Sequence, residues 1–123
     1  MTLQDDETLY LDQLAPSARL SGSVLRGSVV GSHTIIRLIN AVRSFHRYRT
    51  TIYVEEAGRR TFSETEAVLD TGTPMRDIVV LERDDDGLVV HVSIRSEPLD
   101  AVLSLAARLA PLLAPDLPRD VFL

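Results

Sequence analysis

The sequence predicts an α+β domain in which helices cover one face of an antiparallel sheet. Two segments, 32–46 and 98–113, repeat their apolar residues with helical spacing. Two others, 48–70 and 75–98, each have the pattern of two strands joined by a turn that contains glycine. No repeat or long linker divides the 123 residues, so we expect a single domain over 1–123.

Composition and charge exclude several classes of function. The net charge of −5 argues against a nucleic-acid partner, which requires a basic surface. With no cysteine, the chain cannot form a disulfide, a thiolate nucleophile or a cysteine metal site. No apolar run reaches the roughly 18 residues of a membrane span, and the acidic start is unlike a signal peptide. We therefore expect a soluble cytoplasmic protein without a membrane partner.

The first elements are short. Residues 5–14 can form a helix with Leu9, Tyr10 and Leu14 on one side, and Pro16 limits it. Residues 18–24 alternate weakly between apolar and polar side chains, which is typical of a strand.

The clearest helix covers 32–46, with Ser32 as its expected N-cap. Its apolar positions fall on one face, and the remaining side chains lie mostly away from that face. The apolar set is Ile35, Leu38, Ile39, Val42 and Phe45, and the polar set is His33, Arg37, Asn40, Arg43, Ser44 and Arg47.

The segment 48–70 predicts a hairpin with a type II′ turn at Gly58-Arg59. The resulting register pairs Glu56 with Thr61 and continues without interruption to Tyr48 and Leu69. It places one set of side chains inward, namely Tyr48, Thr50, Ile52, Val54, Ser63, Thr65, Ala67 and Leu69. The outward set is Arg49, Thr51, Tyr53, Glu55, Phe62, Glu64, Glu66 and Val68.

The segment 75–98 predicts a second hairpin, with its turn at Asp85-Asp86. In this register Leu81 faces Val90, Val79 faces Val92 and Asp77 faces Ile94. This inward face is apolar except for Asp77. The outward face holds Ile78, Val80, His91, Ser93 and Arg95.

The last helix, 98–113, carries a broad apolar stripe, and Pro98 suits its first turn. The stripe contains Leu99, Val102, Leu103, Ala106, Leu109 and Leu113. The tail 116–123 ends in Phe122 and Leu123, which we expect to dock on this chain or on a neighbour.

Several of these segments resemble the SnoaL-like branch of the nuclear transport factor 2 (NTF2-like) superfamily. The resemblance covers about 14–115, and it rests on Leu25-Arg-Gly, Gly31 before an Ile-rich helix, and strand–DDDG–strand followed by EPLDAVLSLAARLAPLL. It implies a cone-shaped α+β domain in which a curved antiparallel sheet wraps around helices and encloses an apolar pocket. It also implies dimers through the outer sheet face.

The chain departs from this family at its catalytic positions. The resemblance places the oxyanion-hole acid of the steroid isomerases at Val79 and their base near Gly22. The epoxide hydrolase pattern is not matched either, because Ser96 follows Arg95 where Asp is expected. The first helix is also shortened. A steroid-isomerase mechanism is therefore not expected.

Asp77 is the main candidate for catalysis, because a carboxyl group among apolar neighbours has a raised pKa, which suits a general acid or base. The alternative places it in water at the end of its strand, or as a cap on a backbone amide. Tyr48 is the second candidate, as a hydrogen-bond donor, or as a core residue with its hydroxyl at the rim. The residues expected to line the pocket are Ile52, Thr50, Thr65, Val79 and Val92. No metal or other cofactor is expected.

The outward face mixes charges of both signs with aromatic residues, and Tyr53, Glu64, His91 and Arg95 are its expected interface residues. Such a face can pair with a second copy across a two-fold axis, or it can be an ordinary solvated surface. A Ser93–His91–Glu64 nucleophile system is not favoured, because side chains two apart on a strand do not converge.

The expected function is therefore the binding of a small, largely apolar organic molecule, with acid–base chemistry of the cyclase, isomerase or hydrolase type if the protein is an enzyme. The alternative is a non-catalytic ligand-binding or dimerisation module. Phe122 inside the pocket would favour the module, and an open pocket with Asp77 in its wall would favour the enzyme.

Overall fold

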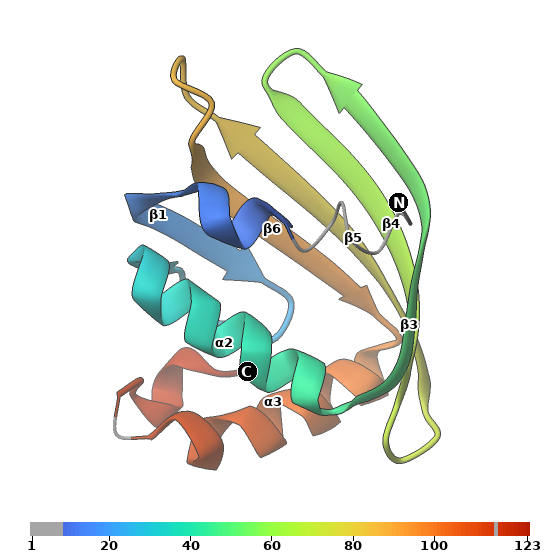
Figure 1. The fold of residues 1–123 in the computed structure, drawn as a ribbon. Coiled ribbons are helices and arrows are strands. Elements are labelled where there is room, and N and C mark those ends of the chain that lie inside the picture. The colour runs from blue at the N-terminus through green and yellow to red at the C-terminus, as the bar shows by residue number, and fades with distance from the viewer. Residues whose placement is uncertain (1–8, 115) are drawn as a thin grey trace.

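The computed structural model describes residues 9–114 and 116–123, and it has the α+β architecture that the sequence predicts. A single six-stranded sheet curves around two helices, which both lie on its concave side (Figure 1). The strands are β1 (Leu14–Gly22), β2 (Val29–Val30), β3 (His46–Ala57), β4 (Arg60–Leu69), β5 (Pro74–Arg83) and β6 (Val89–Glu97). The helices are α2 (Ser32–Ser44) and α3 (Leu99–Leu113), with short 3-10 turns η1 (Leu9–Gln13) and η2 (Arg119–Val121).

The spatial order of the strands is β2-β1-β6-β5-β4-β3. Strands β3 to β6 form a continuous antiparallel meander, while β1 runs parallel to β6 and pairs with the two-residue β2 on its other side. The chain therefore crosses from the β1 edge of the sheet to the β3 edge through α2, which lies across the concave face (Figure 1).

The core lies between that concave face and the two helices. Helix α2 buries Ile35, Leu38 and Ile39, as its periodicity predicts, and its N-cap is Gly31 rather than Ser32. Helix α3 buries its side chains Ala101, Val102, Leu105, Ala106, Leu109 and Leu113. Leu99 and Leu103, which the apolar stripe included, are exposed.

The β3–β4 hairpin has the predicted turn but not the predicted register. Gly58 has a φ of 62° and Arg59 has no positive φ, which fits a type II′ turn. Near the turn Val54 pairs with Ser63 as expected, but Thr51 pairs with Thr65, because a β-bulge inserts Ile52 as an extra residue. A one-residue slip exchanges the two faces of a strand. The side chains of residues 48–51, on the other side of the bulge from the turn, therefore lie on the faces opposite to those predicted.

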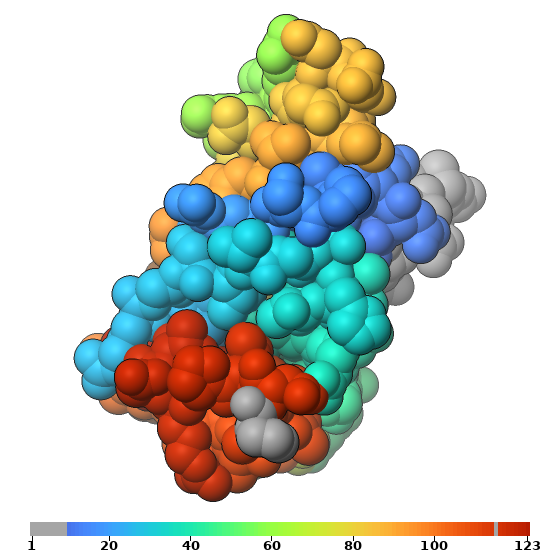
Figure 2. Space-filling model, turned by 90° about the vertical axis from the view of Figure 1, so that its left-hand side faces the viewer, coloured from blue at the N-terminus to red at the C-terminus, as the bar shows by residue number. Residues whose placement is uncertain are grey.

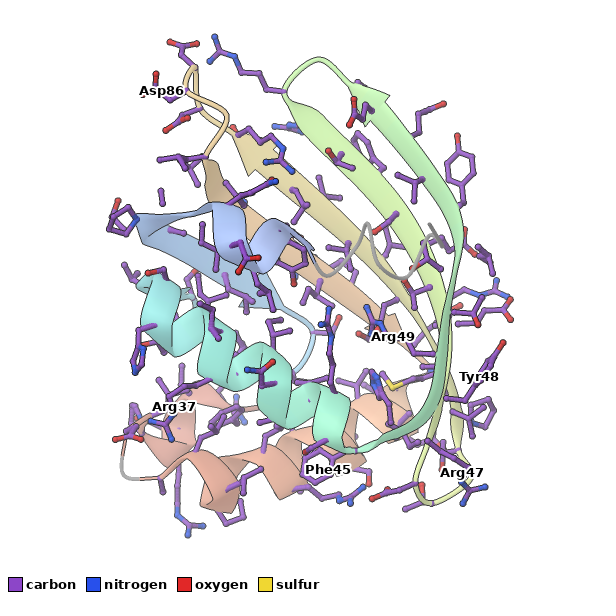
Figure 3. The ribbon with its side chains drawn as sticks, in the orientation of Figure 1. Arg37, Phe45, Arg47, Tyr48, Arg49 and Asp86 are labelled. Atoms are coloured by element: carbon purple, nitrogen blue, oxygen red, sulfur yellow. The ribbon has the colours of Figure 1, made fainter. Side chains whose placement is uncertain are left out.

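The predicted inward positions of Tyr48, Thr50 and Ile52 are therefore wrong. Tyr48 and Ile52 are 56% and 44% exposed on the outer face, and Thr50 donates a hydrogen bond of 2.6 Å to the Tyr48 hydroxyl on that same face. Thr51 and Arg49 take the inward places instead. Figure 3 shows Tyr48 and Arg49 on opposite sides of β3.

The β5–β6 hairpin differs from the prediction by two residues, which leaves the side chains from Asp77 to Leu81 and from His91 to Arg95 on their predicted faces. Val90, predicted inward opposite Leu81, is displaced by a register shift at the start of β6, where Val89 is buried instead. Leu81 pairs with Val92, and Val79 with Ile94. The cause is a wider loop, in which the Asp84 carboxylate accepts hydrogen bonds of 2.9 Å from the backbone N–H groups of Asp86 and Leu88. A two-residue turn at Asp85-Asp86 is therefore wrong.

The C-terminal tail packs on the β1–β2 loop, and the described residues at the other end begin with η1. The predicted helix over 5–14 falls partly outside the described residues, and within them 9–13 form η1 while Leu14 begins β1. Phe122 is 3% exposed and forms an isolated β-bridge with Leu25, so the tail docks on this chain. Figure 2 shows the C-terminal residues, in red, against the surface of α2. Among the described residues, no helix combines the length and apolar character of a membrane span.

Candidate functional site

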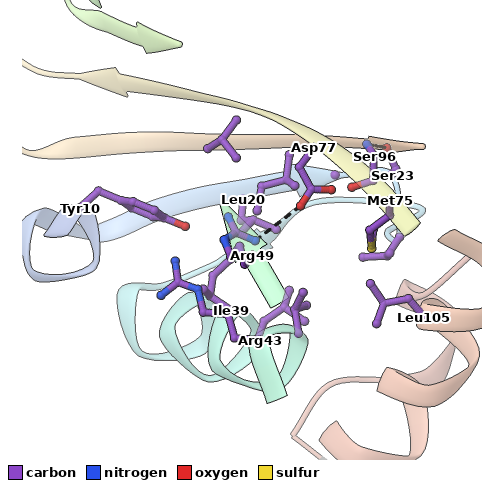
Figure 4. A pocket seen from close by; sticks show the side chains of 16 residues that line it. Tyr10, Leu20, Ser23, Ile39, Arg43, Arg49, Met75, Asp77, Ser96 and Leu105 are labelled. Atoms are coloured by element: carbon purple, nitrogen blue, oxygen red, sulfur yellow. Dashed lines mark hydrogen bonds and ion pairs between the residues drawn. The ribbon is translucent and has the colours of Figure 1, made fainter. Parts of the chain in front are cut away.

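A cavity opens between the concave face of the sheet and the helices, where the ends of β1 and β6 approach α2 and α3. Its volume is about 40 Å³, which is room for roughly three water molecules. Most of its wall is apolar, and the polar groups are few and come from different elements (Figure 4). The lining residues are Tyr10, Leu20, Gly22, Ser23, Val24, Leu38, Ile39, Val42, Arg43, Arg49, Met75, Asp77, Val79, Ile94, Ser96 and Leu105.

Asp77 lies in the middle of this wall. It alternates along β5 with Met75 and Val79, so all three side chains share the inner face. Asp77 is 4% exposed, and its Oδ2 lies 3.6 Å from Nη1 of Arg49. The alternative in which Asp77 is solvated at the end of its strand is therefore wrong.

Arg49 reaches the cavity because of the β-bulge at Ile52. Without that extra residue, the continuous register would turn Arg49 outward and Thr50 inward. The Arg49 side chain is 18% exposed, so its guanidinium is largely withdrawn from water beside Asp77. Figure 4 shows the Arg49 guanidinium beside the Asp77 carboxylate, with a dashed line for the ion pair between them.

Two serines form a polar group at the end of the cavity away from Tyr10 (Figure 4). Ser96 lies directly across from Asp77 on the neighbouring strand β6. The Ser96 backbone N–H donates a hydrogen bond of 2.9 Å to Ser23 Oγ, and the Ser23 N–H donates one of 3.0 Å to the carbonyl of Ile94. Since Ser23 Oγ accepts from the backbone, its hydroxyl proton can be donated to another group.

The cavity brings together only part of the predicted site. Asp77 and Val79 line it, whereas Thr65 and Val92 are fully buried on the inner face behind it. Tyr48, Thr50 and Ile52 lie on the other side of the sheet, so the structure does not bring them to this cavity.

Five polar lining residues were missed: Tyr10, Ser23, Arg43, Arg49 and Ser96. A signal for Arg43 was present, because it follows Ile39 by four residues and so borders the apolar face of α2. No sequence signal indicated that Arg49 faces the cavity, because its orientation depends on the bulge at Ile52. Val79 and Gly22, the positions that the resemblance assigned to an isomerase acid and base, both line the cavity and carry no carboxyl group.

The tail does not fill the cavity. Phe122 packs beside Leu25 and is absent from the lining, so the cavity holds none of the tail's large apolar side chains. Within residues 9–114 and 116–123, no three His, Asp or Glu side chains gather closely enough to hold a metal ion.

The predicted interface residues share the outer face of the sheet. Tyr53 is half exposed, and Glu64 and His91 are partly buried by neighbours on that face. Arg76 lies 3.5 Å from Glu64 and 3.0 Å from Glu66, and Ser21 Oγ lies 3.0 Å from Nε2 of His91. Arg95 is exposed.

Comparison with known proteins identifies the fold. No protein-family model matches the chain, and no curated sequence matches it significantly. An uncharacterised protein with a cystatin-like fold from Silicibacter pomeroyi DSS-3 superimposes with a TM-score of 0.80 at 14% identity, over 90% of this chain and 78% of that one. A steroid delta-isomerase from Pseudomonas aeruginosa gives 0.77 at 20% identity, over 91% of both chains.

A protein described as a SnoaL-like polyketide cyclase, from Jannaschia sp. CCS1, gives a TM-score of 0.63 at 13% identity, over 81% of this chain and 78% of that one. These similarities define an α+β protein with a cystatin-like curved sheet. More particularly, the chain has the NTF2-like fold that SnoaL-like proteins share, as the resemblance in sequence implied.

Proposed function

We propose that the cavity binds a small organic molecule with a largely apolar body, and that Asp77 transfers a proton to or from it. The observation that carries this proposal is a buried carboxyl group in an apolar wall, 3.6 Å from a guanidinium. Small-molecule sites typically combine such walls with a few convergent polar groups. The isomerase and cyclase among the structural neighbours support the class of reaction only through the shared fold.

The neighbouring groups suit Asp77 to the role of a base. A cation within about 4–6 Å favours the ionised form of a carboxyl group, and the ionised form is the one that accepts a proton. In an isomerisation or cyclisation, Asp77 would take a proton from the carbon next to a carbonyl group. The electron pair of that C–H bond moves onto the carbonyl oxygen, where Arg49 or the Ser23 hydroxyl can donate a hydrogen bond. Return of the proton to another carbon completes an isomerisation. In a cyclisation the carbanion instead bonds to a second carbonyl carbon of the same molecule, and the proton goes to the alkoxide oxygen formed there.

Exchange of carbon-bound protons in D₂O tests this role without knowledge of the natural substrate. The probes are 2-pentanone and 4-oxopentanoate, followed by proton NMR. We expect the protein to accelerate exchange beside the ketone of at least one probe. The Asp77→Asn variant should lose that acceleration by about 100-fold or more, the usual contribution of a general base.

Asp86→Asn is the matched control, because Asp86 lies in the exposed β5–β6 loop, and it should behave as the wild type. Circular dichroism establishes that both variants are folded. Failure of the wild-type protein to accelerate exchange of either probe, or equal rates in wild type and Asp77→Asn, would reject the catalytic role and favour the non-catalytic module.

We also propose that the protein forms a homodimer through the outer face of the sheet. Four large side chains are exposed there, namely Tyr48, Ile52, Tyr53 and Ile78. The same face carries both Arg76 and the carboxylates Glu64 and Glu66, so it is complementary to a second copy of itself. This partner is compatible with either function of the cavity.

A further inference from the structure

We propose that Ser23 binds the carbonyl oxygen of the molecule in the cavity, so that the ligand is a neutral carbonyl compound with its carbonyl end at the two serines. This inference rests on the proposed ligand-binding function of the cavity and deepens it. It names the polar group by which the ligand is recognised. It also assigns to Ser23, rather than to Arg49, the hydrogen bond to the oxygen that becomes negative during proton transfer.

The hydrogen-bonding capacity of Ser23 is the first reason. A serine hydroxyl has one proton to donate and can also accept hydrogen bonds. The Ser96 backbone N–H donates to Ser23 Oγ at 2.9 Å, whereas no group in the described part of the chain takes the Ser23 hydroxyl proton. The side chain lies in the partly buried cavity wall, from which a bound ligand would displace water. The ligand must then offer an acceptor atom to that proton.

The rigid backbone around Ser23 is the second reason. The Ser23 N–H donates to the carbonyl of Ile94 at 3.0 Å, and the Leu123 N–H donates to the carbonyl of Val24, the next residue, at 2.8 Å. Together with the Ser96 contact, these hydrogen bonds hold the Ser23 hydroxyl in place before a ligand arrives. A donor that needs no reorganisation is the most effective at stabilising a developing negative charge.

The position of Ser23 relative to Asp77 is the third reason. Ser96 is the direct partner of Asp77 across the β5–β6 pair, and the Ser96 N–H holds Ser23 Oγ. Figure 4 shows both serines on the Asp77 side of the cavity, away from Tyr10. A ligand oxygen bound at Ser23 therefore places the carbon next to the carbonyl group toward the Asp77 carboxylate. Arg49 is less suited to hold this oxygen, because it is already the ion-pair partner of Asp77 at 3.6 Å.

Ser23 acts in the proton transfer without giving up its own proton. Asp77 takes a proton from the carbon next to the carbonyl group, and the electron pair of that C–H bond forms a carbon–carbon double bond. The π pair of the carbonyl group moves onto its oxygen, to which Ser23 donates a hydrogen bond. Asp77 then returns a proton to carbon. Ser23 is thus a catalytic residue that also determines which ligands bind.

Binding of a matched pair of ligands tests the acceptor. In 2-methyl-1-pentene a CH₂ group replaces the carbonyl oxygen of 2-pentanone, so the two molecules have nearly the same shape and only the ketone accepts a hydrogen bond. We expect Ser23→Ala to weaken the binding of 2-pentanone about fivefold, which corresponds to one neutral hydrogen bond. The binding of 2-methyl-1-pentene should change by less than about twofold. Protein NMR titration measures both affinities.

The carbonyl carbon signal of bound 2-pentanone gives a readout that a merely structural role would not move. A hydrogen bond draws electron density from that carbon, so we expect the signal to move to higher frequency on binding to the wild type and to move less with Ser23→Ala. Ser23→Thr keeps a hydroxyl and should retain the displacement. Ser104→Ala, at an exposed position on α3, is the matched control and should behave as the wild type.

Circular dichroism establishes that each variant is folded. If Ser23→Ala does not fold, Ser23→Cys takes its place, because a thiol is only a weak donor. Equal affinities and equal carbonyl signals in the wild type and the Ser23 variant would overturn the inference.

Exchange of 2-pentanone protons in D₂O separates this inference from the proposed function. We expect Ser23→Ala to lower the Asp77-dependent exchange rate by about 100-fold, the usual cost of removing one such donor. Exchange that depends on Asp77 but not on Ser23 would overturn the inference and still support the proposed function. A carbonyl signal that depends on Ser23, without any exchange, would support the carbonyl ligand and reject the proton transfer. If 2-pentanone does not bind, the inference falls.

Discussion

Gly22 shows how a single residue sets the spacing between two strands at the candidate site. A Cβ atom at this position would lie 2.9 Å from the carbonyl oxygen of Ile94 on β6, and that oxygen belongs to the backbone. The two strands run parallel here, and Ile94 also accepts the hydrogen bond of Ser23. A side chain at position 22 would therefore push apart the strands that form one end of the cavity.

We predict that Gly22→Ala lowers the free energy of unfolding by about 1–3 kcal/mol, the usual cost of overpacking. Gly27→Ala is the matched control, because a Cβ there meets no atom within 4 Å, and it should change stability by less than about 0.5 kcal/mol. Urea denaturation under identical conditions measures both. Equal stability of the two variants would show that β1 and β6 can separate at no cost.

The predicted face of a side chain was correct where the alternation of inward and outward residues along a strand alone decides it. Asp77, Val79 and Val92 are buried on the inner face as predicted, although the register of their hairpin was wrong. A slip of two residues preserves the alternation, so the error did not reach these side chains. Arg49 could not be found in this way, because a slip of one residue reverses it.

At the scale of elements, the bulge in β3 is the feature that the sequence did not reveal. Ile52 has a β-branched side chain that fits a regular strand as well as a bulge, and no glycine marks the site. With the bulge in place, Val54 on one side of Ile52 and Thr51 on the other both turn inward. The helices α2 and α3 and the turn at Gly58-Arg59, in contrast, have local signals and lay close to their predicted bounds.

Helix α3 is held mainly by its buried side chains. We predict that Leu109→Ala, at a fully buried position, lowers the free energy of unfolding by about 2–5 kcal/mol, because it removes apolar contacts and leaves a cavity. Leu103→Ala, on the exposed side of the same helix, should cost less than about 0.5 kcal/mol. Thermal and urea denaturation measure the difference, and similar losses would mean that α3 packs differently.

A surface ion pair also connects α3 to the sheet. Arg108 donates two hydrogen bonds of 2.7 Å to the Asp70 carboxylate, and its guanidinium lies 4.0 Å from the centre of the Phe45 ring. The hydrogen bonds from Arg108 lower the pKa of Asp70 below its ordinary value of 3.8. Because the folded-state pKa is the lower one, the pair stabilises the fold above pH 3.8, and that contribution is lost as the pH falls through the folded value.

We predict that Asp70→Asn has a lower melting temperature than the wild type at pH 7, and that the difference disappears in acid as the wild-type Asp70 becomes protonated. Asp120→Asn, at an exposed position near the end of the chain, should melt with the wild type at every pH. Calorimetry between pH 2 and pH 7, a range of about five units around the ordinary carboxyl pKa, measures this. A difference that is constant with pH would exclude the ion pair as its cause.

At the scale of the whole molecule, the order of two helices and two long hairpins was enough to predict the fold. Each hairpin is formed by neighbouring segments, and the helices must cover its apolar face. The parallel pairing of β1 with β6 was not predicted, because it joins segments about 70 residues apart, and no local pattern specifies such a partner. The cavity depends on that pairing, so its polar residues were the least predictable part of the molecule.

The proposed dimer is tested at this scale. We predict a dimer for the wild-type protein in sedimentation velocity and a monomer for Ile78→Glu, because an unpaired carboxylate in the interface is costly. Leu103→Glu is matched in exposure, at 46% against 44% for Ile78, but lies on α3, and it should remain dimeric. A monomeric wild type, or a dimeric Ile78→Glu, would show that the outer face is an ordinary solvated surface.

The docked tail ties the last residues of the chain to the cavity loop. The N–H of Leu123 donates to the carbonyl of Val24, and Arg26 donates from its backbone to Val121 and from Nε to Phe122. Val24 and the preceding Ser23 line the cavity. Digestion of the final residues by a carboxypeptidase would thus release the loop that carries the Ser23 hydroxyl, and a fusion partner joined directly after Leu123 would load the same contacts.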